Sequence, residues 1–96
     1  MRFEWDEEKN EENVRKHGLT FSDAEAIFAS PMLVDTDRRK DYGEDRFIGI
    51  GFLKNFIVTV AYTEQADVIR VFSLRKALKH ERERFEDSLK EQLGAS

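Results

Sequence analysis

The sequence predicts an α+β fold: two N-terminal helices, a four-stranded antiparallel sheet, and a C-terminal helix. Three observations predict this order. Helix-capping residues and charged helical turns occupy residues 6–30. Residues 46–74 are rich in β-branched and aromatic side chains and are divided by short polar turns, as in hairpin-connected strands. Residues 78–93 carry apolar side chains at helical spacing.

The first helix has a start and an end that are visible in the sequence. Asp6 is a suitable N-cap, and Glu7 and Glu8 fall in the first turn, where the helix dipole favours acidic side chains. The helix is expected to run to His17, because Gly18 suits the left-handed position that ends many helices.

A second, short helix is predicted from a capping box at residues 22–25. It should end near Pro31, since the residue before a proline disfavours helix. Residues 32–34 then begin a strand, and residues 35–45 form a charged, turn-rich stretch.

Three further strands are predicted at residues 46–53, 56–62 and 68–74. The connections are short, with Lys54 and Asn55 in a hairpin turn and residues 63–67 in the next turn. Tight connections join antiparallel neighbours, so these strands should form a meander with the strand at residue 32.

The C-terminal helix is expected to start near Arg75 or Lys76 and to end at Gly94. Its apolar side chains form one stripe that should pack on the sheet: Leu78, Phe85, Leu89 and Leu93.

Composition limits the possible classes of protein. Ninety-six residues make one domain, residues 1–96, with no cysteine for a disulfide, a thiolate nucleophile or a zinc site. The sequence has neither an apolar run long enough to cross a membrane nor a signal peptide, which favours a cytoplasmic protein. The net charge of −4 argues against indiscriminate nucleic-acid binding.

Charge is nevertheless distributed unevenly. Residues 1–12 hold six acidic side chains and two basic ones, whereas residues 70–84 hold six basic and two acidic ones. Such a cationic segment either forms a solvated helix face or binds an anionic ligand such as an RNA backbone.

Lys9, Asn13 and His17 follow one another at i, i+4 and i+8, and therefore share one face of the first helix. An ammonium, an amide and an imidazole together make a surface able to contact a phosphate and move a proton. The alternative is an ordinary hydrated face on a highly charged helix.

Arginines mark the ends and the middle of the predicted strands. Arg46, Arg70 and Arg75 converge on one face or edge of the sheet if their strands are neighbours. Strict alternation would place Arg70 on the same face as Phe72 and Leu74. An arginine in line with core residues either pairs with a carboxylate or is held in a site. Glu64 is a candidate partner or general base.

No signature of a serine hydrolase, a P-loop or a dinucleotide site is present, and no metal-ligand spacing is visible. The sequence therefore predicts neither a cofactor nor a metal.

An ordered set of short motifs resembles a known family. It covers residues 3–6, Lys9, Asn13, residues 16–18 and 46–48, Tyr62 with Thr63, residues 69–77, and Glu81 with Arg82. Together these resemble the BrnT toxins of bacterial type II toxin–antitoxin pairs. Phe85 stands where that family commonly has tyrosine.

The resemblance implies a RelE-like fold and metal-independent RNA cleavage that inhibits translation. It implies a BrnA-like antitoxin as partner in a hetero-oligomer, with DNA contacted only through that complex and no membrane. Carried over to this chain, it implies catalytic roles for Lys9, His17, Arg46, Arg70 and Arg75. Glu64 is a possible general base because of its position in the predicted turn, and not because of the resemblance. Further RNA-binding cations would be Lys76, Lys79 and Arg82.

In this mechanism Arg70 and Arg75 stabilise charge, with Lys9 or Arg46 assisting, and His17 carries the proton. The rival hypothesis is a non-catalytic protein-interaction module whose basic groove binds a partner.

Overall fold

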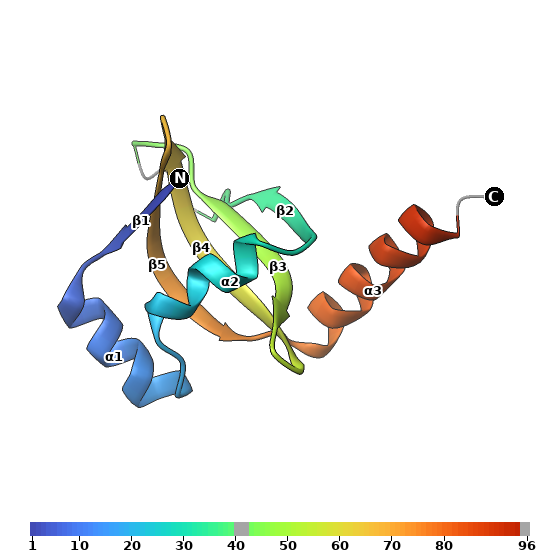
Figure 1. The fold of residues 1–96 in the computed structure, drawn as a ribbon, viewed down its shortest axis with the longest axis horizontal. Coiled ribbons are helices and arrows are strands. Elements are labelled where there is room, and N and C mark those ends of the chain that lie inside the picture. The colour runs from blue at the N-terminus through green and yellow to red at the C-terminus, as the bar shows by residue number, and fades with distance from the viewer. Residues whose placement is uncertain (40–42, 95–96) are drawn as a thin grey trace.

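A computed structural model describes residues 1–39 and 43–94 of the chain. Within these ranges a five-stranded sheet has the strand order β1-β5-β4-β3-β2 (Figure 1). The elements, in chain order, are β1 (Arg2–Trp5), α1 (Glu7–His17), a 3-10 turn (Phe21–Asp23), α2 (Ala24–Phe28), β2 (Met32–Thr36), β3 (Phe47–Leu53), β4 (Phe56–Gln65), β5 (Val68–Lys76) and α3 (Lys79–Leu93). The α+β class is confirmed.

The sheet differs from the predicted one by a fifth strand. β1 pairs in parallel with β5, placing Phe3 beside Ile69 and Trp5 beside Val71, so the sheet is mixed rather than purely antiparallel. Four residues are too few for the alternation of a strand to be recognised, and the partner strand lies more than sixty positions away in the chain. The antiparallel meander from β2 to β5 is as predicted.

Several boundaries also moved. β4 ends three residues later than predicted, at Gln65, and β5 ends two residues later, at Lys76, because the ladder between the two strands continues at both ends. The C-terminal helix therefore starts at Lys79, later than predicted. The predicted capping box at residues 22–25 is wrong: the Thr20 hydroxyl accepts the Ser22 N–H, and a 3-10 turn comes before α2.

Two apolar clusters hold the sheet, one on each face. On the first face the 3-10 turn and α2 cover the sheet, with Phe21 and Ile27 fully buried against residues of β4 and β5. On the second face Phe85 of α3 is buried with Ile50, and its ring meets Phe52 edge-on at 5.0 Å. Phe85 is thus a core residue.

Only part of the predicted stripe of α3 packs on the sheet. Figure 1 shows α3 leaving the sheet and running outward toward the C-terminus. Leu89 is partly buried beside Phe85, whereas Leu93 is 88% exposed and Leu78 also lies at the surface. The prediction that all four apolar residues pack on the sheet is therefore wrong.

Candidate functional site

A β-bulge in β5 arranges the side chains that face the candidate site. Ser73 is opposite Ala61 and Val71 is opposite Tyr62, which leaves Phe72 as the extra residue. A bulge reverses the alternation of a strand beyond it. Leu74 consequently joins Ile69 and Val71 in the core under α2, and the prediction that it shares a face with Arg70 and Phe72 is wrong.

The bulged Phe72 collects two cations on the second face of the sheet. The Arg46 guanidinium lies 4.0 Å from the centre of the Phe72 ring, and the Lys9 ammonium lies 5.4 Å from it. Arg46 lies immediately before β3, Lys9 is in α1 and Phe72 is in β5, so three separate segments of the chain meet here. Cation–π contacts of this kind are worth about 1 kcal/mol each, enough to orient long side chains.

A polar pocket of about 260 Å³ opens beside this ring, between α1 and β5. It brings together the two α1 residues predicted to be catalytic, Lys9 and His17, with the bulge residues Phe72 and Ser73. Its lining residues are Lys9, Glu12, Asn13, Lys16, His17, Phe72 and Ser73. The pocket wall therefore holds two ammonium groups, an imidazole, a hydroxyl and one carboxylate.

Asn13 lies on the predicted face of α1, but its amide does not point to solvent. The residue is 5% exposed, and its amide bonds the backbone of Leu74 and of Leu19. Its amide atoms are thus used by the fold and are not presented to a ligand, contrary to the expectation of a phosphate contact.

Arg70, which is nearer the start of β5 than Phe72, lines a second small pocket. Its guanidinium is 3.7 Å from the Glu4 carboxylate, and Thr63 and Glu44 line the same pocket. Glu44 is also 3.8 Å from Arg46. Since both Arg70 and Glu4 are substantially exposed, their ion pair contributes little to stability and a competing anion can displace it.

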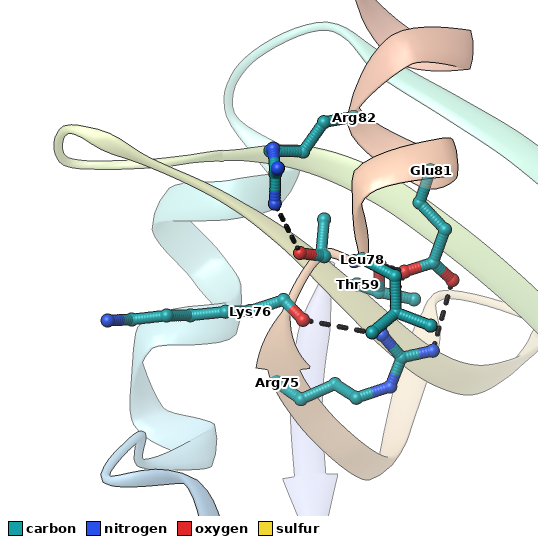
Figure 2. Close-up of polar contacts among 7 residues, drawn as sticks. Thr59, Arg75, Lys76, Leu78, Glu81 and Arg82 are labelled. Atoms are coloured by element: carbon teal, nitrogen blue, oxygen red, sulfur yellow. Dashed lines mark hydrogen bonds and ion pairs between the residues drawn. The ribbon is translucent and has the colours of Figure 1, made fainter.

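Arg75 is held by a buried carboxylate at the junction of β5 and α3 (Figure 2). Its guanidinium donates to both oxygens of Glu81, at 2.8 and 3.0 Å. The same carboxylate accepts hydrogen bonds from the Thr59 hydroxyl and from the N–H of Leu78, the N-cap residue of α3. Hydrogen bonds from Arg75 are the main cause that lowers the pKa of Glu81 from 4.5 to about 2, although burial acts in the opposite direction.

The three cations expected to bind RNA surround this junction. Lys76 points away from Arg75 in Figure 2, and its ammonium lies 4.6 Å from the centre of the Phe56 ring. Arg82 donates to the Ala77 carbonyl at 3.0 Å, and Lys79 is exposed at the start of α3. The junction therefore does not gather them into the pocket beside α1.

Glu64 is not brought to the pocket either. It lies two residues after Tyr62 on β4, on the sheet face that α2 covers. Burial, and secondarily the charge of Glu64, raises the pKa of the Tyr62 phenol to about 12. Glu64 does not line the pocket that contains Lys9 and His17.

Sequence reasoning missed the roles of Phe72, Asn13 and Glu81. The bulge at Phe72 contains no glycine or other residue type that would indicate a bulge in the sequence. Glu81 resembles the other acidic residues of a highly charged helix. The one usable signal was Asn13, a short amide in the interior of a helix, where it is unfavourable unless it bonds something specific.

Among the described residues, no group of three histidine or acidic side chains is placed to hold a metal ion. No helix within residues 1–39 and 43–94 is long and apolar enough to cross a membrane.

One comparison with known proteins identifies a family. The family model described as "Ribonuclease toxin, BrnT, of type II toxin-antitoxin system" matches residues 5–81. That range includes α1, the bulge in β5 and the junction carrying Arg75 and Glu81. A comparison with curated proteins finds no match. Because the family model covers most of the chain, the protein belongs to the BrnT family of type II toxin–antitoxin ribonuclease toxins.

Proposed function

We propose that this chain is a cytoplasmic endoribonuclease that cleaves RNA without a metal ion, inhibits translation, and is neutralised by a BrnA-like antitoxin. The observation that carries the proposal is the Phe72 ring, which lies beside both Arg46 and Lys9 at a pocket that also contains His17. Family membership supports the ribonuclease class.

The reaction is an attack of the ribose 2′-hydroxyl on the neighbouring phosphorus. His17 accepts the 2′-hydroxyl proton, a bond forms between the 2′-oxygen and phosphorus, and the bond from phosphorus to the 5′-oxygen breaks. The departing 5′-oxygen takes a proton from an ammonium of the pocket, that of Lys9 or Lys16. The products are a 2′,3′-cyclic phosphate and a 5′-hydroxyl.

Arg46 and Lys9 stabilise the additional negative charge on the phosphorane. Their cation–π contacts with Phe72 orient both cations before the substrate binds. Stabilisation of the transition-state charge by such preorganised groups is often the largest catalytic contribution. Arg70 adds a third cation to Arg46 and Lys9. It binds a flanking phosphate of the RNA, which replaces the Glu4 carboxylate as the partner of Arg70. An acidic segment of the antitoxin would cover these three cations through complementary charge.

The test is cleavage of a defined RNA by the purified chain in EDTA, with identification of the product ends. His17→Gln and Arg46→Ala should each lower kcat by at least about 100-fold. Arg15→Ala is the matched control, since Arg15 is an exposed cation of the same helix outside the pocket. Cleavage that required a divalent metal, or that survived both pocket variants, would refute the mechanism.

A second function, a protein-interaction module without catalysis, is favoured by one observation. Arg75, a cation expected in the active site, is committed to Glu81. Intact RNA with retained binding of a partner protein would select the module. Cleavage lost in Arg75→Ala but retained in Glu81→Gln would instead assign Arg75 to the substrate, because the second variant disturbs the same junction while leaving the guanidinium in place.

A further inference from the structure

The edge of β5 changes partner in the middle of the strand. β1 pairs with β5 only as far as Trp5 and Val71. Beyond that point the neighbour is α1, which packs against β5 (Figure 1). The bulge begins at the next residue, so the segment carrying Phe72 and Ser73 lies where no described strand supports that edge.

The Asn13 side chain takes the place of a strand at this edge. Its Nδ2 donates to the Leu74 carbonyl at 2.7 Å, and its Oδ1 accepts the Leu74 N–H at 3.1 Å. One primary amide thus satisfies both backbone groups of one residue, as a paired strand residue would. Nδ2 also donates to the Leu19 carbonyl at 2.9 Å, which ties the chain after α1 to the same point.

From this geometry we infer that Asn13 is a positioning residue, which holds α1 at a fixed distance from the β5 bulge so that Lys9 and His17 face Phe72 and Ser73. The inference rests on the proposed function for its catalytic consequence. Asn13 is four residues after Lys9 and four before His17, so it anchors the middle of the helix face that lines the pocket. Neither a carboxylate nor a hydroxyl offers the same pair of donors and acceptor.

The experiment compares Asn13→Ala and Asn13→Asp with Asn10→Ala. Asn10 is the matched control: it also ties α1 to a neighbouring segment, accepting the Phe21 N–H at 2.8 Å, but its side chain makes no hydrogen bond to β5 among the described residues. For the Asn13 variants kcat should fall on the order of 100-fold with KM near the wild-type value, because displaced catalytic groups impair the reaction more than binding. Asn10→Ala should keep the wild-type kcat.

A second readout does not depend on activity. The nuclear Overhauser effect between the Lys9 side chain and the Phe72 ring, and slow hydrogen exchange of the Leu74 N–H, should be present in wild type and in Asn10→Ala and lost in both Asn13 variants. If the wild-type chain failed to cleave RNA, the proposed function would fall, and this readout would still decide the positioning role.

Three outcomes would overturn the inference. The first is an unchanged kcat, or an unchanged Lys9–Phe72 contact, in folded Asn13 variants. The second is an equal loss in Asn10→Ala, which would indicate general loosening of α1. The third is failure of both Asn13 variants to fold, which would make Asn13 a determinant of the fold and not of the pocket.

Discussion

The Arg75 guanidinium and the Glu81 carboxylate form a two-point ion pair, 2.8 and 3.0 Å long, that joins the end of β5 to the first turn of α3. Glu81 is only 8% exposed, and its carboxylate also accepts hydrogen bonds from the Thr59 hydroxyl and the Leu78 N–H. A buried carboxylate with this many donors stays ionised and depends on all of them. The pair therefore sets where α3 leaves the sheet.

Removing either partner should destabilise the protein strongly. We expect Glu81→Gln and Arg75→Ala each to lower the free energy of unfolding by about 3 kcal/mol, because each leaves the other partner without its counter-charge. The double variant should lose about as much as either single variant, since both report the same interaction. Urea denaturation of the four proteins measures this, and additive losses would contradict it.

An exposed ion pair on the same helix provides the control. Arg84 lies 2.6 Å from Asp35, a shorter contact than that of Arg75, but the two side chains are 56% and 59% exposed. Arg84→Ala should cost less than about 1 kcal/mol because water screens the pair. Similar losses for Arg84→Ala and Arg75→Ala would show that burial is not what strengthens the Glu81 pair.

Acid should weaken the same junction. The pKa of Glu81 is lowered from 4.5 to about 2 in the folded chain, so folding favours the ionised form. Its contribution, about 3 kcal/mol, is present above pH 4.5 and is lost as the pH falls through 2. The stability difference between wild type and Glu81→Gln should therefore shrink between pH 4.5 and 2 in urea titrations. A difference that stayed constant with pH would refute the assignment.

The Phe72 ring should matter for RNA because it orients two cations. Phe72→Leu keeps the residue apolar but removes the ring that contacts Arg46 and Lys9. The variant loses about 1 kcal/mol of cation–π energy that orients the two cations. Its affinity for a 2′-O-methyl RNA, which cannot be cleaved, should therefore be about fivefold weaker. Phe72→Tyr keeps the ring and is the control. Equal affinities for both variants would remove Phe72 from the site.

Close packing between α2 and β3 should make Gly51 intolerant of a side chain. A Cβ at this position would lie 3.2 Å from Ile27 Cγ2 and 3.1 Å from Met32 Cγ. Ile27 is fully buried and cannot move freely, so Gly51→Ala should lower the free energy of unfolding by about 1 to 2 kcal/mol. Thermal denaturation tests this, and a variant as stable as wild type would show that α2 can shift outward.

Elements defined by short-range signals were predictable. Asp6 accepts the N–H groups of Glu8 and Lys9, and Gly18 adopts φ 69° at the end of α1, as the sequence predicted. The turn at Lys54 and Asn55 joins β3 and β4, also as predicted. In each case the determining contacts join residues a few positions apart, so residue types alone carry the information.

The candidate site was predictable only in part. The sequence placed Lys9 and His17 on one helix face, and the structure does bring them to one pocket. It could not indicate that Arg46 would meet Lys9 over Phe72, because that meeting requires a bulge in β5 and the docking of α1 on its edge. It also treated Arg75 as available for a substrate, since Glu81 had no visible reason to be its partner.

By itself, then, the sequence determined the helices, the antiparallel meander and the resemblance to BrnT toxins, because capping, alternation and motif order are local properties of the chain. Only the tertiary structure decided that β1 pairs in parallel with β5 and on which face of the sheet Phe72 lies. It also decided that the Asn13 amide and the Glu81 carboxylate are buried. These features depend on hydrogen bonds between residues far apart in the sequence, such as the one from Asn13 to Leu74. Such bonds form only when folding brings the partners together and buried polar groups need hydrogen-bond partners.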